Sequence, residues 1–420
     1  MSVEKKEVND YMPIWVDDSH ISPEWMQQKT GIKGIMDCKV LDISNQNKRS
    51  ECVRDGTTLR LHLEVRNAAT ISKRTLILKQ ATEKGSPHSK RLGLARESLF
   101  YDTLANNLPA HSTPSIFYSY GDFESGKKCI IMEDIQNSID SGILFGPGNP
   151  NNWKRNLPEL IANVGTPTPT SKEVALVTFK EIAKIHAIYW KRPDLLSHDK
   201  TWLRGQEWIR GKGKEKWETS QNIVRLFWKK FLDVESNKKN ENQPMVKWDT
   251  VVRSAVEKAV NGISWEAQLE RLNTEEQWTL VHGDFWPGNV MWITKDDDND
   301  GIKKSSIRFL DWEMVGLGSG LQDLGQYVIS NMNPAERKEN EYELVQAYFH
   351  ELMSHNDSIN LVFEQCWEEY KIGAVERWMW FLVYFVGNGM IDWGQYFHDQ
   401  ISSFMMDHKI TAQDITQPRP

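Results

Sequence analysis

The sequence predicts an α+β fold in two parts: a small antiparallel β-sheet with one inserted helix, then a larger, mostly helical part with an inset β-hairpin. Short alternating or apolar runs, which are typical of strands, dominate residues 37–135, and amphipathic stretches typical of helices dominate the rest. Strand-like patterns return only between residues 279 and 313. We therefore predict one domain over residues 1–135 and a second over residues 136–420.

Composition narrows the possible partners of this 420-residue chain. The formal net charge is −7, which disfavours a broad nucleic-acid surface or a polybasic membrane surface. The longest apolar run, residues 378–386, is too short to cross a bilayer, so we expect a buried helix there and no stable membrane association. The four cysteines form no CxxC pair and the N-terminus has no apolar signal segment, so we expect a cytoplasmic protein. The sequence leaves the oligomeric state open.

The first part is expected to be mainly β-structure. One strand shows clear alternation, with Leu59, Leu61, Leu63 and Val65 on a single face. Apolar residues at helical spacing then predict one helix over residues 90–108. The predicted strands cover residues 38–43, 58–65, 74–80, 115–123 and 127–135.

The second part begins with a long loop. Residues 140–171 are rich in Gly, Pro, Asn and Thr, which favour turns. An amphipathic helix follows over residues 171–190, with Ser171 as its expected N-cap. Residues 200–278 and the region after residue 313 read as mostly helical, and the last ten residues are expected to fray.

A polar loop, LVHGDFWPGN, lies between two apolar runs of the second part. It holds His282, Asp284 and Asn289 at the spacing His-x-Asp-x₄-Asn, which is found in kinase catalytic loops. Asp311 ends an apolar strand twenty-two residues after Asn289. A hairpin would place Asn289 and Asp311 side by side, and their amide and carboxylate oxygens suit a hard cation such as Mg²⁺. Asp284 would accept the proton of a substrate hydroxyl.

Residues of the first part fit a nucleotide site. Lys79 ends the strand TLILK, and Glu97 follows eighteen residues later in the expected helix. A strand lysine paired with a helix glutamate is how kinases fix a cation on the α- and β-phosphates. The adenine is expected to hydrogen-bond the backbone at the end of the last strand, at Met132, Glu133 and Ile135.

Three segments carry a resemblance to a known family. IAKIHAIYW, LVHGDFWPGN and FLDWEMVGLGSGLQDLG resemble the aminoglycoside phosphotransferase and choline kinase superfamily, and HAIYW with ELVQAYFHEL most resembles its ecdysteroid kinase-like branch. The resemblance covers roughly residues 50–390. It implies a bilobal, protein-kinase-like fold and the transfer of the γ-phosphoryl group of ATP, with Mg²⁺, to a hydroxyl of a small metabolite.

The resemblance also implies a role for each matching residue. Asp284 would be the catalytic base, and Asn289 and Asp311 would be the Mg²⁺ ligands. Lys79 would hold the phosphates and Glu97 would orient it. The residues implied as structural supports of the catalytic loop are His282 and Asp323.

Three features depart from kinase patterns, and two of them bear on the substrate. Only Gly56 lies near the expected phosphate-covering loop, where several glycines are usual. Trp286 stands two residues after Asp284, where protein kinases have a lysine, and no DFG or APE motif follows Asp311. The last two departures favour a small-molecule kinase over a protein kinase.

The acceptor is left open by the sequence. The chain has 18 tryptophans and a net negative charge. Aromatic side chains together with negative charge favour an amphipathic or cationic alcohol as the acceptor. The alternative for the tryptophans is core packing, and for the chain as a whole it is a nucleotide-binding pseudokinase that acts as a scaffold or regulator. The residues considered for an acceptor pocket are Trp286, Trp312, Trp378, Asp392 and Trp393.

Three metal-like patterns are weaker. DDDNDG at residues 296–301 imitates a calcium loop, but its twelfth position is Ile307 rather than Glu, so we interpret it as an acidic hairpin tip. HELMSH imitates a zinc helix, but His350 and His355 are five residues apart and diverge around a helix. A metallohydrolase stays an alternative, although it lacks a second histidine ligand; its metal would be held by His282, Asp284, Asp311 and Glu313.

Overall fold

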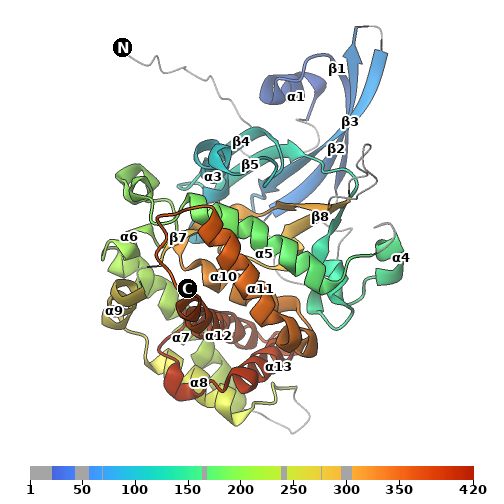
Figure 1. The fold of residues 1–420 in the computed structure, drawn as a ribbon. Helices are drawn as coiled ribbons and strands as arrows, with labels where there is room; N and C mark the ends of the chain where they lie inside the picture. The colour runs from blue at the N-terminus through green and yellow to red at the C-terminus, as the bar shows by residue number, and fades with distance from the viewer. Residues whose placement is uncertain are drawn as a thin grey trace. The chain divides into compact units, whose positions relative to one another are not determined.

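The computed structural model describes residues 21–42, 56–68, 70–162, 168–237, 244–275, 277–294 and 305–420. The chain divides into two compact units (Figure 1). The first unit is Met1–Asn107 with Pro114–Ile135, and the second is Leu108–Thr113 with Gln136–Pro420. The predicted α+β class, with an antiparallel sheet first and a helical region after it, is confirmed.

The first unit is built on a five-stranded antiparallel sheet with the order β1-β2-β3-β5-β4. The alternation predicted for β2 is confirmed, because Leu59, Leu61, Leu63 and Val65 are all buried in the core of this unit. The short helix α1 (Pro23–Thr30) packs against β1 and β4. The strands are β1 (Ile35–Asp42), β2 (Gly56–Asn67), β3 (Thr70–Ala81), β4 (Ile116–Asp122) and β5 (Lys127–Glu133).

The single helix predicted over residues 90–108 is wrong, because two helices occupy this region. Helix α2 (Ser86–Leu92) ends at Gly93, which has φ +67° in the left-handed region that glycine adopts at little cost. The chain then turns into α3 (Arg96–Thr103). The break sets the direction of α3 independently of α2, and Glu97 lies in the first turn of α3.

In its described residues, the second unit contains two small sheets. Strand β7 (Thr279–Val281) pairs with β10 (Gly316–Gly318), and β8 (Val290–Thr294) pairs with both β6 (Ser138–Asp140) and β9 (Ser305–Phe309). The hairpin predicted between the strand that follows Asn289 and the strand that ends at Asp311 is confirmed, because β8 pairs antiparallel with β9 and Val290 lies opposite Phe309. The calcium-like segment 296–301 lies outside the described residues.

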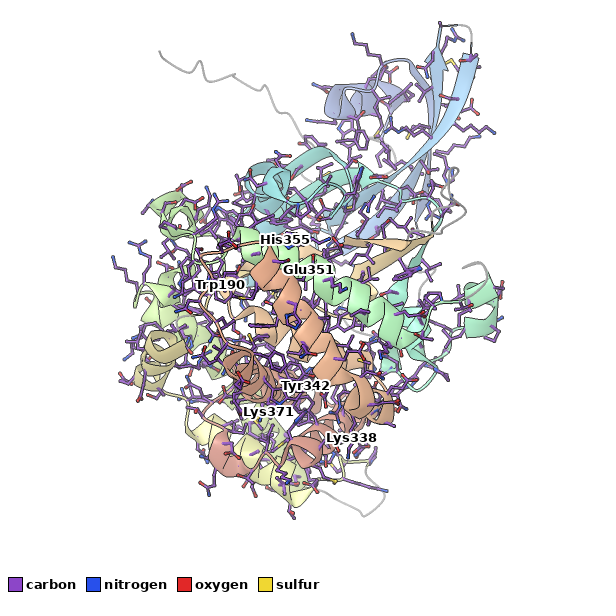
Figure 2. All side chains as sticks on the ribbon, in the orientation of Figure 1. Trp190, Lys338, Tyr342, Glu351, His355 and Lys371 are labelled. Atoms are coloured by element: carbon purple, nitrogen blue, oxygen red, sulfur yellow. The ribbon has the colours of Figure 1, made fainter. Side chains whose placement is uncertain are left out.

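Helices make up most of the second unit. Helix α5 packs along α11, and α10 packs along α12. His355, the C-cap residue of α11, places Nδ1 3.6 Å from Glu351 Oε1, one turn back along the helix (Figure 2). The helices are α4 (Leu157–Ala162), α5 (Ser171–Ile188), α6 (Gln206–Ile209), α7 (Lys214–Ser236), α8 (Thr250–Asn261), α9 (Trp265–Glu275), α10 (Gly320–Asn331), α11 (Pro334–Ser354), α12 (Phe363–Gly387) and α13 (Ile391–His408).

Two boundaries differ from the prediction. The N-cap of α5 is Thr170 rather than Ser171: the Thr170 hydroxyl accepts from the Glu173 amide, and the Glu173 carboxylate accepts from the Thr170 amide. This reciprocal capping box satisfies two amide groups, which a cap at Ser171 would not. The region predicted as a loop over residues 140–171 contains the short helix α4.

The prediction that the last ten residues fray is wrong. Gln417 and Arg419 are almost fully buried. The Glu376 carboxylate on α12 accepts hydrogen bonds from the Thr416 amide at 2.7 Å and from Arg419 Nε at 2.7 Å, so buried ionic contacts hold the segment in place. Nothing in the local sequence of this polar, proline-containing segment signals those distant partners.

The predicted buried helix over residues 378–386 is part of α12, and Trp378, Met379 and Leu382 are buried there. Across the residues that the structure describes, every helix is too short or too polar to cross a membrane.

Candidate active site

The loop between β7 and β8 is held at its start by a carboxylate from α10. Asp323 lies in the first turn of α10, and its two oxygens accept from consecutive backbone amides. Oδ2 accepts from His282 N at 2.7 Å, and Oδ1 accepts from Gly283 N at 3.1 Å. Because Asp323 is buried, these hydrogen bonds are shielded from water and fix the backbone immediately before Asp284.

The same loop is fixed from the other side by the segment after β9. The His282 ring hydrogen-bonds through Nε2 to the Leu310 carbonyl oxygen at 2.8 Å, and it lies 4.6 Å from the Trp312 ring. Gly283 has φ +79°, and a Cβ at this position would collide with the Met314 carbonyl oxygen. The close approach of the two segments therefore requires glycine at position 283.

Asp284 is half-buried and hydrogen-bonded at both carboxylate oxygens. Gln326 Nε2 donates to Oδ1 at 3.0 Å, and Asn289 Nδ2 donates to Oδ2 at 3.1 Å. Burial raises the pKa of Asp284, and Glu313 adds to the increase. The Arg377 guanidinium and the two donors oppose this effect, but the pKa stays above its usual value.

Asn289 is buried, and its carboxamide has a defined orientation. Nδ2 donates to the Asp284 carboxylate and also to the Asp284 carbonyl oxygen at 2.9 Å, so the amide oxygen Oδ1 is directed away from Asp284. The Asn289 carbonyl oxygen accepts from Leu310 N at 2.8 Å, which places Asn289 beside the peptide that precedes Asp311. The pairing of β8 with β9 thus brings the two predicted metal ligands to neighbouring positions.

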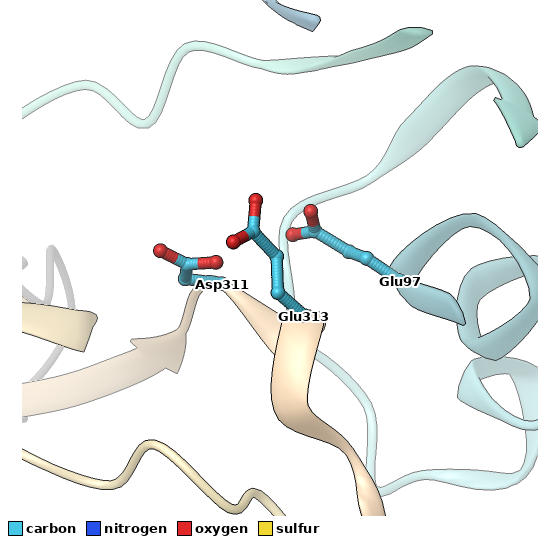
Figure 3. A group of neighbouring side chains, drawn as sticks. All are labelled: Glu97, Asp311 and Glu313. Carbon is cyan, nitrogen blue, oxygen red and sulfur yellow. The ribbon is translucent and has the colours of Figure 1, made fainter. Parts of the chain in front are cut away.

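Asp311 and Glu313 lie together in the turn after β9 (Figure 3). Their carboxylates offer oxygen atoms within 4.8 Å of each other. Asp311 has φ +64°, a left-handed conformation that is uncommon for residues other than glycine and that is concentrated at functional sites. Two carboxylates beside a carboxamide are hard oxygen donors of the kind that bind Mg²⁺, so these residues fit such an ion.

Sequence reasoning missed two residues of this site, Arg377 and Gln326. Arg377 is buried on α12; its Nη2 donates to the Gly283 carbonyl oxygen at 2.6 Å, and its Nε donates to Gln326 Oε1 at 3.4 Å. Burial lowers the pKa of Arg377 to about 10, opposed by Asp284 and Asp323, so the side chain stays charged at neutral pH. A charged residue directly before the longest apolar run was the available signal, because buried charges are nearly always paired.

Two further buried side chains, His186 and Tyr348, lie next to Asp323. Buried His186 on α5 places Nε2 3.6 Å from Asp323 Oδ2, and its Nδ1 hydrogen-bonds the Tyr348 hydroxyl at 2.9 Å. Burial raises the pKa of Tyr348 well above its usual value, so the hydroxyl keeps its proton. Gly320 begins α10 here, and a Cβ on it would collide with His186 and Tyr348.

The C-terminal segment also reaches this network. The Arg419 guanidinium pairs with Glu369 at 2.5 Å and with Glu376 at 2.7 Å, and all three side chains are buried. Glu376 and Arg377 are adjacent on α12, so the segment is fixed to the part of the helix that holds Arg377 against Gly283.

In the first unit, Lys79 and Glu97 form an ion pair with Nζ 2.9 Å from Oε2. Lys128 on β5 also contacts Glu97 Oε2, at 2.8 Å, and sequence reasoning missed it. Gly56 begins β2 opposite Ala81, and a Cβ there would meet the Gln80 carbonyl oxygen at 2.6 Å. Gly56 therefore lies where the paired strands β2 and β3 are closely packed.

The strand end predicted to bind adenine is also in the first unit. Met132 and Glu133 end β5, and the Glu133 carboxylate accepts from both the amide and the hydroxyl of Ser115. Ile135 is the last residue of this unit.

The residues considered for an acceptor pocket differ in exposure. Trp312 is fully buried next to the loop between β7 and β8, and Trp378 stacks on Phe397 at 4.3 Å in the core, which matches the alternative of core packing. Trp393 is half-buried and lies 6.2 Å from Trp153. The half-buried Trp286 ring covers Gly288, where a Cβ would collide with it, and Asp392 is exposed in the first turn of α13.

Comparison with known families gives one match. Residues 166–361, a little under half of the chain, match the family model of the ecdysteroid kinase-like family. The matched segment contains Asp284, Asn289, Asp311 and Asp323. The resemblance predicted from the motifs is therefore confirmed. No curated protein matches the chain significantly.

Several solved structures are distantly similar. Choline kinase from Cryptosporidium parvum Iowa II is 10% identical, with 92% of each chain covered and a TM-score of 0.49. Ethanolamine kinase from Plasmodium vivax is 11% identical, with 89% of this chain and 83% of that chain covered and a TM-score of 0.43. A microcompartment-associated aminopropanol kinase is 9% identical, with 94% and 98% covered and a TM-score of 0.41.

Proposed function

Because residues 166–361 match the ecdysteroid kinase-like family, we propose that this chain transfers the γ-phosphoryl group of ATP to a hydroxyl group of a small metabolite. The observation that carries the proposal is the environment of Asp284. Its carboxylate is oriented by Gln326 and Asn289, and its backbone is fixed through Asp323. A rigidly held, half-buried carboxylate is suited to orient an acceptor hydroxyl.

In this proposal Asp284 acts as a general base. The acceptor hydroxyl would donate a hydrogen bond to the Asp284 carboxylate. Its proton would pass to Asp284 as the new P–O bond forms and as the bond between the γ-phosphorus and the leaving ADP breaks. Arg377 lowers the pKa of Asp284 and thereby favours the ionised form that the base needs. Gln326 and Asn289 keep the carboxylate in one orientation.

The residues proposed to hold Mg²⁺ are Asn289 and Asp311, with Glu313 as a further carboxylate near Asp311. A bound Mg²⁺ ion supplies positive charge that neutralises the phosphates. Lys79, oriented by Glu97, is proposed to contact the phosphates. ATP is thus the proposed phosphoryl donor, and the acceptor is proposed only as a hydroxylated small molecule.

The test uses the purified full chain with ATP, Mg²⁺ and a panel of hydroxylated metabolites, read by coupled ADP release and by ³¹P NMR of the product. We expect Asp284→Asn to bind nucleotide with nearly unchanged affinity and to lose transfer by about 10³-fold or more, because removing a catalytic base has effects of about this size. Full turnover by Asp284→Asn would refute the proposal. Nucleotide binding without turnover for any acceptor would favour the pseudokinase alternative.

A further inference from the structure

Arg60 on β2 forms an ion pair with Asp134, the residue that directly follows β5. Arg60 Nε lies 2.9 Å from Asp134 Oδ2, and Nη2 donates to Oδ1 at 3.3 Å. Both residues belong to the first unit, in whose sheet β3 lies between β2 and β5. The Arg60 side chain therefore reaches across β3, because the ion pair joins positions that are two strand spacings, or about 10 Å, apart.

The strand register places this ion pair on the same face of the sheet as Lys79. Arg60 lies opposite Ile77 on β3, and Lys79 is two residues from Ile77. Side chains alternate between the two faces of a strand, and residues that lie opposite each other share a face. Leu59 and Leu61, which flank Arg60 on β2, are buried in the core on the other face.

A short apolar stretch separates Lys79 from the ion pair. Met132 on β5 lies opposite Ile77, and Lys79 lies opposite Ile130, two residues toward one end of β5. Asp134 lies two residues beyond Met132 in the other direction, so each step along the strand is about 7 Å. Because Ile77 is only half-buried, its side chain keeps apolar surface between the two charged groups.

The guanidinium of Arg60 is suited to contact a flat ring. Its Nε and Nη2 atoms face Asp134, so the ion pair engages one edge of the guanidinium, and the carboxylate does not cover its planar faces. The Arg60 side chain is 36% exposed and therefore has surface to offer to a ligand. A guanidinium stacks favourably on aromatic rings and is more weakly hydrated than an ammonium group.

A nucleotide carries charged phosphates at one end and a flat base at the other, which is the order of Lys79 and Arg60 on this face. We propose that Arg60, held in place by Asp134, packs against the base of the nucleotide whose phosphates Lys79 contacts. Arg60 then distinguishes a nucleotide from a phosphate chain that has no base. The inference rests on the proposed function, because it assumes that Lys79 binds phosphates.

The experiment compares the dissociation constants of ATP and of tripolyphosphate, which has no base, by calorimetry on the full chain with Mg²⁺. The wild type should bind ATP more tightly. Arg60→Met should weaken ATP binding by about fivefold or more, the size of a cation–π contact, and should change tripolyphosphate binding by less than about twofold. Arg60→Lys keeps the charge but not the planar group, so it should weaken ATP binding almost as much.

Two further variants complete the set. Arg66→Met is the matched control, because Arg66 is an exposed arginine on the same strand and face, about 20 Å further along β2. It should leave both dissociation constants unchanged. Asp134→Asn removes the charge that orients Arg60, so it should weaken ATP binding, but by less than Arg60→Met does. Circular dichroism of each variant checks that it is folded.

The outcomes separate the inference from the proposed function. Selective loss of ATP affinity in Arg60→Met supports the inference, since a residue that only stabilises the sheet would affect both ligands alike. Equal losses for the two ligands, unchanged ATP affinity in Arg60→Met, or full ATP affinity in Arg60→Lys overturns the inference alone. Unchanged ATP affinity in Asp134→Asn overturns the role given to Asp134. Absence of ATP binding by the wild-type chain overturns both the inference and the proposed function.

Discussion

Arg377 Nη2 donates to the carbonyl oxygen of Gly283 at 2.6 Å, which ties a buried cation on α12 to the peptide immediately before Asp284. The same guanidinium lowers the pKa of Asp284 against the effect of burial. One side chain therefore fixes the position of the proposed base and favours its ionised form.

Replacing Arg377 by Gln should shift the pH dependence of phosphoryl transfer. The base must be ionised, so activity falls as the pH drops through the pKa of Asp284, which already lies above its usual value. Loss of the guanidinium raises that pKa further, and the acidic limb of kcat/KM should move to higher pH. Pre-steady-state or kcat/KM measurements across pH would check this.

A matched control for that experiment is Arg337→Gln. Arg337 is another buried arginine of the second unit, and it pairs with Glu341 at 2.7 Å and with Asp407 at 2.5 Å. Its loss should lower stability without moving the acidic limb. An equal shift in both variants would contradict the role given to Arg377.

Gly320→Ala should destabilise the protein by about 1–3 kcal/mol, because the added methyl group would overlap both His186 and Tyr348. The displaced imidazole would also weaken the support of Asp323, so kcat should fall more than the KM for ATP rises. Urea unfolding and steady-state kinetics measure the two effects. Gly148→Ala is the control, since its Cβ would meet no atom within 4 Å, and its free energy of unfolding should change by less than about 0.5 kcal/mol.

Arg419→Gln should reduce the free energy of unfolding by about 3–5 kcal/mol, because it leaves the buried carboxylates of Glu369 and Glu376 without their cation. The double variant Arg419→Gln/Glu376→Gln should recover part of this loss, because it also removes one of the two carboxylates that Arg419→Gln leaves unpaired. Denaturant unfolding gives the comparison. A single variant as stable as wild type would show that the segment contributes little.

Cys129 and Cys366 should resist alkylation in the native protein. Burial raises the pKa of each thiol to about 12, so very little reactive thiolate is present at neutral pH, and access is blocked as well. Mass spectrometry after iodoacetamide treatment at pH 7.5 should find both unmodified, and both modified once the chain is unfolded in guanidinium. Rapid native labelling of either residue would contradict the described packing.

Local patterns were sufficient for much of the fold. The alternation in β2 predicts its buried face, and the spacing of His282, Asp284 and Asn289 identifies the loop between β7 and β8, since these signals lie within a few residues of each other. The helix break at Gly93 was not predicted, although it too has a local signal, because glycine commonly ends helices in the left-handed conformation.

Contacts between distant segments could not be predicted in the same way. Arg377 lies 94 positions from its acceptor Gly283, and Arg419 lies 43 positions from Glu376. Lys128 belongs to no recognisable sequence motif, and its position near Glu97 follows only from the register of β5 against β3. Such pairings depend on the packing of whole elements, which a single sequence does not reveal residue by residue.

The segment Leu108–Thr113 has a consequence for any attempt to split the protein. It belongs to the second unit, although first-unit segments flank it on both sides, so the chain passes between the units three times. The Ser112 carbonyl oxygen accepts from Phe309 N at 2.8 Å, at the outer edge of the β6-β8-β9 sheet. A fragment starting at residue 136 would lack this cover and expose an open strand edge, which promotes self-association. The two units therefore cannot be separated by dividing the chain at one point. A single proteolytic cut after residue 135 would leave part of the second unit on the N-terminal fragment.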